Sequence, residues 1–164
     1  MEGVFPVTFQ NTMNIKKFRH IAIIIQSMEV MLPFYRDILG FRIKKDFRIS
    51  NPEFQKGIGL PDASARCVHL ALPESAVELE LFEFAPPNDR KGDYPAINDP
   101  GFRHIALVVQ NLDESVAELK QKGVVFHSAP VRFETPKEIK GFCFVYLKDP
   151  EGNFIELNEL PEGS

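Results

Sequence analysis

Two similar patterns of apolar and polar positions run along the chain, each passing from a strand to a helix and then to further strands. In the first pattern, residues 18–25 form a β-branched, apolar run that predicts a buried strand. Met31, Tyr35, Ile38 and Leu39 then fall on one face of a helix, and Gly40 predicts its end. Three more strands are predicted, with a loop or short helix before the second of them (strands 41–47, 66–72 and 77–84; loop 49–63).

The second pattern has the same order. Residues 102–109 predict a strand, and Asn111 with Glu114 three residues later predicts a capped helix that ends at Gly123. Leu112, Val116 and Leu119 form the apolar face of this helix. Three strands follow, with a loop after the first (strands 124–126, 142–147 and 154–160; loop 128–140). Each half of the chain is therefore predicted to be βαβββ.

The two patterns share residues as well as order. Phe18-Arg19-His20-Ile21-Ala22 recurs 84 positions later as Phe102-Arg103-His104-Ile105-Ala106. The last predicted strand of each half contains a Glu-Leu pair, at Glu80-Leu81 and Glu156-Leu157, with a further Glu three residues on. We interpret these matches as an internal repeat. The prediction is a single domain over 1–164, made of modules 16–86 and 101–160 with the linker 87–100 between them.

Composition and charge exclude several classes of protein. The 164 residues include 19 Lys+Arg and 23 Asp+Glu, so the net charge of −4 argues against a nucleic-acid-binding protein. The longest wholly apolar run is 21–25, far short of the roughly 20 residues that span a bilayer. The first twelve residues do not resemble a signal peptide. Cys67 and Cys143 form no CxxC motif, which favours a reducing, cytoplasmic location, although a bridge between them stays open.

Four side chains indicate chemistry. His20 and His104 lie in apolar strands at equivalent places in the repeat, as do Glu80 and Glu156. A lone buried histidine is usually just hydrogen-bonded, and a lone buried carboxylate is costly, but the equivalence of the two pairs favours a shared role. A divalent cation would compensate all four side chains. Two imidazoles and two carboxylates without a thiolate suit Zn²⁺, Ni²⁺, Co²⁺, Mn²⁺ or Fe²⁺.

The end of the chain resembles a known family. The run 147–157, LKDPEGNFIEL, is similar to the DP-x-G-x-x-x-E-L signature that closes the vicinal oxygen chelate superfamily, which includes glyoxalase I, methylmalonyl-CoA epimerase, extradiol dioxygenases and bleomycin resistance proteins. The resemblance covers about residues 16 to 160. It implies an α+β fold of two βαβββ modules that form an open, incompletely closed mixed-sheet barrel around one divalent metal ion, with the ligands His20, Glu80, His104 and Glu156.

Other carboxylates and histidines remain as alternatives. Glu78 and Glu83 are the neighbouring candidates for the first carboxylate, and Glu80 is preferred because Glu80-Leu81 aligns with Glu156-Leu157. His69 and His127 are possible additional acid/base groups, although hydrogen bonding in the core or at the surface is the commoner role. The loop 128–140 is a candidate cover that would hold an anionic substrate through Arg132, Lys137 or Lys140, with a solvated loop as the commoner reading.

The resemblance also implies a function. The superfamily binds small-molecule substrates with vicinal oxygens, and the ligand set here looks most like that of glyoxalase I. We therefore expect a glyoxalase- or epimerase-like lyase or isomerase that forms an enediolate, with Glu80 or Glu156 as the base. The alternatives are an extradiol-type ring-cleaving dioxygenase and a non-catalytic, antibiotic-binding protein. A homodimer is expected by analogy, and whether the site lies within one chain or is shared across the dimer stays open.

Overall fold

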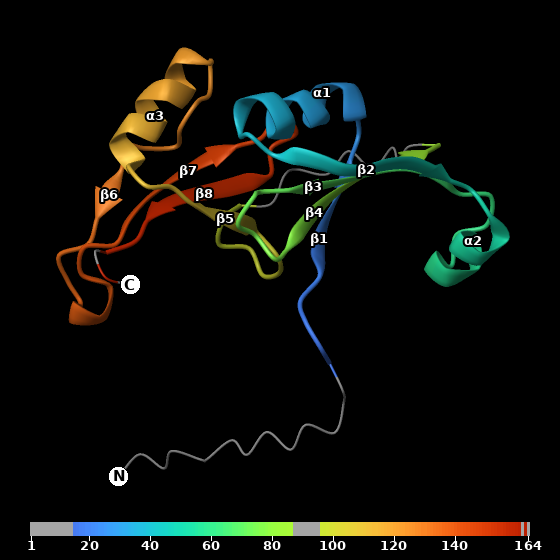
Figure 1. Ribbon diagram of the computed structural model, residues 1–164, viewed down its shortest axis with the longest axis horizontal. Coiled ribbons are helices and arrows are strands. Elements are labelled where there is room, and N and C mark those ends of the chain that lie inside the picture. Colours follow the sequence, from blue (N-terminus) through green and yellow to red (C-terminus); the bar gives the residue numbers. More distant parts are fainter. Residues whose placement is uncertain (1–14, 87–95, 162, 164) are drawn as a thin grey trace, which may run out of the picture.

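Two four-stranded mixed sheets make up the computed structural model of the chain, which describes residues 15–86, 96–161 and 163 (Figure 1). The first sheet has the order β1-β4-β3-β2 and the second the order β5-β8-β7-β6. The strands of the first sheet are β1 (His20–Ile25), β2 (Arg42–Ile49), β3 (Ser64–Ala71) and β4 (Glu78–Ala85). Those of the second are β5 (His104–Val108), β6 (Val131–Arg132), β7 (Cys143–Lys148) and β8 (Phe154–Glu159). The predicted fold class is confirmed, and the two sheets do not close into a barrel.

The helices join the strands in the predicted order. Helix α1 (Met28–Pro33) continues into a π-helical turn, η1 (Phe34–Ile38), and α3 (Leu112–Gln121) occupies the equivalent place in the second half. The segment predicted as a loop or short helix contains α2 (Pro52–Ile58), and the loop before β7 contains a 3₁₀ turn, η2 (Lys137–Ile139). Within the part of the chain that the structure describes, no helix is both long and apolar enough to span a membrane.

The strand register confirms the repeat. In both sheets the first strand pairs in parallel with the last, and Ala22 lies opposite Glu80 just as Ala106 lies opposite Glu156. Each histidine is therefore two residues before the alanine that faces its glutamate. Strands β1 and β5 are the edge strands of their sheets and lie side by side, because both line the same two clefts.

The additional glutamate of each Glu-Leu pair anchors a helix. Glu83 accepts a hydrogen bond from the Met28 N–H at 2.8 Å, and Glu159 accepts one from the Leu112 N–H at 2.9 Å. Both N–H groups belong to the first residue of a helix, where no partner exists within the helix itself. Ser27 precedes α1 as its N-cap residue but makes no side-chain capping bond, and the Glu83 carboxylate of β4 accepts from the Met28 N–H instead.

One core holds the two halves together and gives the molecule two different faces. Helices α1 and α3 lie on the same side of the sheets (Figure 1). Buried apolar side chains of both halves form a single cluster with them, including Met31, Tyr35, Leu70, Leu112 and Leu157. Because side chains alternate along a strand, the side chains of His20 and His104 point away from this cluster. Both histidines therefore belong to the face that α1 and α3 leave uncovered.

The Asp-Pro-x-Gly-Asn turn fastens one half of the chain to the other. Asp149 is 4 % exposed and accepts hydrogen bonds from the Tyr35 hydroxyl of the first half at 2.9 Å and from the backbone N–H groups of Glu151 and Asn153. The carboxylate of Glu151 accepts from the N–H groups of Gln26 and Ser27, at the start of α1. The turn in the run that resembles the family signature thus forms hydrogen bonds that join the two halves of the chain.

One predicted strand is wrong. Residues 124–126 contribute only a single bridge, from Phe126 to Leu147, and the outer strand of the second sheet is β6, inside the predicted loop 128–140. Val125 is 81 % exposed, whereas Val124 and Phe126 are partly buried against the core. The edge of β7 is instead paired by Val131–Arg132.

Two further expectations concern the cysteines and the linker. Cys67 and Cys143 are both buried free thiols, so the bridge left open by the sequence does not form. Most of the predicted linker, 87–95, lies outside the described residues.

Candidate metal centre

In the first half, His20 and Glu80 come together as predicted, and His69 joins them. The Nδ1 atom of His20 lies 3.3 Å from Oε1 of Glu80, and Nε2 of His69 lies 2.9 Å from the same oxygen. The Nδ1 atom of His69 is 2.8 Å from Oε2 of Glu78. His69 and Glu80 are 4 % and 6 % exposed. Glu78, the alternative candidate for the first carboxylate ligand, therefore contacts the other ring nitrogen of His69. The hydrogen bond from His69 holds the pKa of the Glu78 carboxyl below its usual value.

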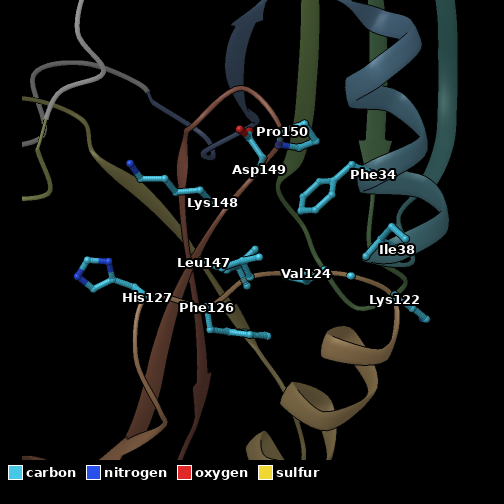
Figure 2. A pocket seen from close by; sticks show the side chains of 12 residues that line it. Phe34, Ile38, Lys122, Val124, Phe126, His127, Leu147, Lys148, Asp149 and Pro150 are labelled. Atoms are coloured by element: carbon cyan, nitrogen blue, oxygen red, sulfur yellow. The ribbon is translucent and has the colours of Figure 1, made fainter.

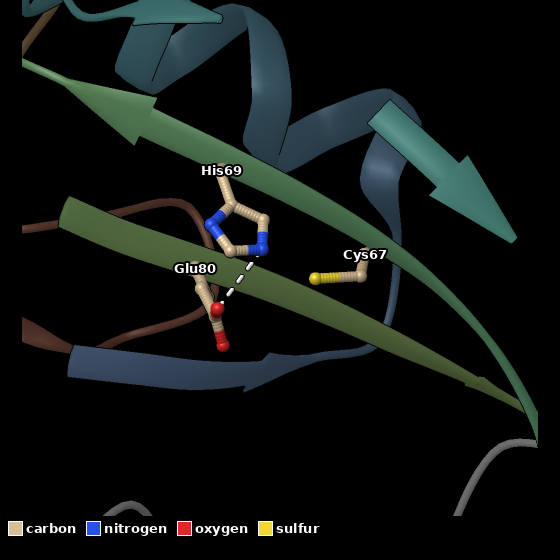
Figure 3. A group of neighbouring side chains, drawn as sticks. All are labelled: Cys67, His69 and Glu80. Carbon is tan, nitrogen blue, oxygen red and sulfur yellow. Dashed lines mark ion pairs between the residues drawn. The ribbon is translucent and has the colours of Figure 1, made fainter. Parts of the chain in front are cut away.

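A buried cysteine lies next to this cluster (Figure 3). Donor atoms of Cys67, His69 and Glu80 all lie within 4.8 Å of one another. In the described part of the chain, this is the group of three or more potential metal ligands that lie this close together. Burial, and then the charge of Glu80, raise the pKa of the Cys67 thiol to about 12. The thiol is therefore protonated at neutral pH, and sequence reasoning gave no sign that it approaches Glu80.

In the second half, His104 and Glu156 also come together as predicted. The Nε2 atom of His104 lies 3.3 Å from Oε2 of Glu156. The Tyr146 hydroxyl donates to that oxygen at 2.6 Å, and the Asn158 amide donates to Oε1 at 3.2 Å. Burial, and then the hydrogen bond to Glu156, raise the pKa of Tyr146 to about 12, so the phenol keeps its proton and remains a donor.

The two clusters are built alike but differ in one partner of the carboxylate. His69 lies opposite Glu80 in the β3–β4 register, and Tyr146 lies opposite Glu156 in the β7–β8 register. The imidazole of the first half thus occupies the place of the phenol in the second half. Strand alternation puts both side chains on the same face as the carboxylates. The pairing itself depends on the β7–β8 register, so the sequence carries no signal that singles out Tyr146 as the partner of Glu156.

The donor set fits a divalent cation. Nδ1 of His20 is buried and has no hydrogen-bond partner, although it lies beside a carboxylate oxygen. Imidazole nitrogens and carboxylate oxygens on one face are ligands that Zn²⁺, Ni²⁺, Co²⁺, Mn²⁺ and Fe²⁺ accept. The two His–Glu pairs remain separate: among the described residues, no three potential ligands drawn from both halves lie within 4.8 Å of one another. His104 nevertheless lines one cleft with Ala22 and another with Glu78, so the pairs flank the same seam between β1 and β5.

The remaining candidates lie elsewhere. His127 lines a pocket of about 640 Å³ that contains none of the four predicted ligands, and Figure 2 shows its imidazole at the rim, pointing away from Phe34 and Ile38. Arg132 binds the Glu159 carboxylate and the Gly141 carbonyl, both at 2.9 Å, so its charge is already partnered. Lys137 and Lys140 are exposed, at η2 and directly after it.

Comparisons with known proteins agree with this architecture. The family model described as "Glyoxalase/Bleomycin resistance protein/Dioxygenase superfamily" matches residues 17–157. The chain is 32 % identical over 147 residues to the uncharacterized protein YaeR of Escherichia coli, covering 90 % of this chain and 98 % of that one. It is 25 % identical over 146 residues to human mitochondrial methylmalonyl-CoA epimerase, covering 89 % of this chain and 75 % of that protein.

Solved structures show the same fold. A glyoxalase family protein from Bacillus cereus superposes with a TM-score of 0.78 at 18 % identity, covering 92 % of this chain and 97 % of that one. A relative from Enterococcus faecalis superposes with a TM-score of 0.64 at 24 % identity, covering 90 % and 100 %. With the family model, the repeated halves and the two His–Glu pairs in agreement, the chain belongs to the glyoxalase/bleomycin resistance protein/dioxygenase superfamily.

Proposed function

We propose that this protein is a metal-dependent enzyme that moves a proton next to a carbonyl group, in the manner of a glyoxalase or an epimerase. The observation that carries the proposal is the pair of equivalent His–Glu contacts, His20 with Glu80 and His104 with Glu156, on one face of the molecule. The ion would be held by these four side chains, between β1 and β5. Relatives named as epimerases, including the human protein and a 2-epi-5-epi-valiolone epimerase of Actinomyces that is 36 % identical over 103 residues, support this direction.

The two carboxylates are suited to different tasks. A divalent ion held by His20, Glu80, His104 and Glu156 would supply Lewis acidity, which would acidify a C–H bond next to a substrate carbonyl. Glu156 accepts a hydrogen bond at each oxygen, from Tyr146 and from Asn158, and these donors fix the orientation of its carboxylate. The two histidine contacts of Glu80 both use Oε1, which leaves Oε2 to take up and return the substrate proton. Glu80 is therefore our candidate for the base, and Glu156 for the fixed ligand.

His69 is a positioning residue in this scheme. Its ring lies between Glu78 and Glu80, with contacts of 2.8 and 2.9 Å at its two nitrogens. A side chain held at both ends has few orientations available, and it fixes the carboxylate that it contacts. This role agrees with the hydrogen-bonded core position that the sequence favoured for His69 over an acid/base role.

Isotope exchange from solvent tests the proposed reaction. The protein is loaded with Zn²⁺, Ni²⁺, Co²⁺, Mn²⁺ or Fe²⁺ and incubated in D₂O with a panel of 2-oxo-aldehydes, acyl-CoA thioesters and catechols. We expect deuterium to enter the carbon next to a carbonyl of one panel member, with no uptake of O₂. Uptake of O₂ with a catechol would instead establish the dioxygenase alternative, and binding without turnover would point to a sequestering protein.

A homodimer is the proposed assembly. Phe18, Phe102 and Val108 are 65 %, 67 % and 62 % exposed, at or beside the edge strands β1 and β5. Contiguous exposed apolar groups are uncommon on monomers, and a second copy of the chain would cover them. Light scattering of the wild-type protein should give the mass of two chains, and Phe18→Lys with Phe102→Lys should give the mass of one. A wild-type protein that stays monomeric at micromolar concentration would contradict this assembly.

A further inference from the structure

An apolar pocket lies on the first sheet, farther along the strands that carry His20 and Glu80. Its volume is about 470 Å³, and Ile24, Leu60, Ala63 and Phe84 contribute to its lining. Pockets that bind small molecules are typically about 300–1,000 Å³ and mostly apolar, with few polar groups. The pocket therefore has the size and lining of a binding site, and none of the four predicted metal ligands lines it.

The strand register connects this pocket to the candidate metal centre. Side chains at every second position share a face, so His20, Ala22 and Ile24 of β1 lie in one row. Glu80, Phe82 and Phe84 of β4 form the neighbouring row, with Ile24 opposite Phe82. Phe84 lies four positions after Glu80 along β4, and this spacing corresponds to about 13 Å at roughly 3.3 Å per residue. A molecule held at Glu80 can thus extend along a continuous face into the pocket.

Three phenylalanine rings form the wall along this path. Phe54 of α2 stacks on Phe82 and on Phe84, with ring centroids 6.3 Å apart in both pairs, and the centroids of Phe82 and Phe84 are 5.7 Å apart. The first turn of α2, which carries Phe54, is capped by the Asn51 side chain, which accepts from the Phe54 N–H. The rings offer flat apolar surface, on which alkyl and aryl groups pack well.

The charged lining of the pocket disfavours a ligand with an anionic group at this end. Among the described residues that line it, the charged one is Asp62, and none is a lysine or an arginine. A phosphate or carboxylate group on a ligand would meet repulsion from Asp62 and would find no cation to pair with among these described residues. An uncharged, apolar group has neither cost.

We propose that this pocket binds an apolar substituent of the substrate, an alkyl chain or an aryl ring, while the vicinal oxygens of the same molecule are held at the His–Glu pairs. The proposal rests on the proposed function, and it narrows the substrate class to compounds with vicinal oxygens at one end and an uncharged hydrophobic group at the other. The substituent lies against Phe82 and Phe84 and ends among Leu60, Ala63 and Ile24.

Hydroxamic acids of increasing chain length test the proposal, because their two adjacent oxygens chelate divalent metals. Acetohydroxamate, hexanohydroxamate and octanohydroxamate are titrated calorimetrically into the Ni²⁺-loaded, full-length protein. Burial of one methylene contributes about fourfold in affinity at most. We expect octanohydroxamate to bind at least about 30-fold more tightly than acetohydroxamate, with the gain concentrated in the longer chains.

A charged substitution in the pocket should remove this gain. Leu60 is 52 % exposed, so Leu60→Asp leaves the core intact and adds a second carboxylate beside Asp62. The dissociation constant of octanohydroxamate should rise to near that of acetohydroxamate, while acetohydroxamate binds as before. Val125→Asp is the matched control, because Val125 is also exposed and lines a different pocket. This control should preserve the dependence on chain length.

The possible results separate the subsite from the metal centre. Equal affinity for all three hydroxamates, or a gain with chain length that survives in Leu60→Asp, would overturn the subsite while leaving the proposed metal centre standing. If no hydroxamate binds and the protein takes up no Ni²⁺, the proposed function fails, and the inference that rests on it fails too.

Discussion

Replacing His20 or His104 with alanine should abolish binding of the divalent ion. The purified wild-type protein should hold about one ion per chain by elemental analysis, and each variant should hold nearly none. Loss of a ligand that directly contacts a metal costs more than loss of a supporting partner, which typically lowers affinity about 10–100-fold. The melting temperature gives a second readout, since an ion at 100 times its dissociation constant stabilises the folded state by about 2.7 kcal/mol. The rise in melting temperature that the ion causes in the wild type should be absent in both variants.

Two further variants test whether the four proposed ligands, rather than their neighbours, bind the ion. Tyr146→Phe removes the 2.6 Å hydrogen bond to Glu156 but keeps the carboxylate, so metal affinity should fall by about 10–100-fold rather than vanish. Cys67→Ser should leave metal content unchanged, because Cys67 is not one of the four proposed ligands. A metal that is lost in Cys67→Ser and retained in His104→Ala would show that the Cys67, His69 and Glu80 group is the true site.

Tyr35→Phe should destabilise the fold without touching the proposed metal centre. The Tyr35 side chain is 0 % exposed, and its hydroxyl donates to Asp149 at 2.9 Å across the junction of the halves. Burial and the charge of Asp149 raise the pKa of Tyr35 far above its usual value, so this hydroxyl stays protonated at every pH at which the protein is folded. A hydrogen bond to a charged group contributes about 1.5–3 kcal/mol, so urea unfolding should show a loss of about 2 kcal/mol.

Asp149→Ala should cost more, about 3 kcal/mol or above, because it also releases the N–H groups of Glu151 and Asn153. Asp37→Ala is the control, since Asp37 forms its ion pair with Arg36 on the surface, and it should change stability little. If Tyr35→Phe and Asp37→Ala unfold at the same urea concentration, the junction is not held by this contact. The metal content of Tyr35→Phe should equal that of the wild type.

The repeat made much of the fold predictable. The recurrence of Phe-Arg-His-Ile-Ala and of Glu-Leu marked equivalent strands, and the structure places Ala22 opposite Glu80 as it places Ala106 opposite Glu156. The helix of the second half was recognisable from Asn111, whose side chain does accept from the Glu114 N–H. These signals are local, so they do not depend on how the halves pack.

Edge pairing and side-chain partners were not predictable in the same way. Residues 124–126 have the composition of a strand, but they pair with β7 only through the Phe126–Leu147 bridge, and the ladder is formed by Val131–Arg132 at Phe144 and Cys143. The partner of Glu80 is His69, which is eleven positions away in sequence and becomes its neighbour only through the β3–β4 register. The Asp-Pro turn was recognisable in the sequence as a family signature. Its contact with Tyr35 was not, because Tyr35 lies 114 positions earlier in the chain than Asp149.

The amino-acid sequence by itself determined the order of elements, the equivalence of the halves and the two candidate His–Glu pairs, because periodicity, capping residues and repeats act over a few neighbouring positions. The tertiary structure alone decided which donor holds each carboxylate, His69 for Glu80 and Tyr146 for Glu156. It also decided that the histidines share the face left open by α1 and α3, and that an apolar pocket continues from Glu80 toward Phe84. These features arise where strands distant in the chain are brought into register, and that register is specified only when one face of each strand is buried in the common core.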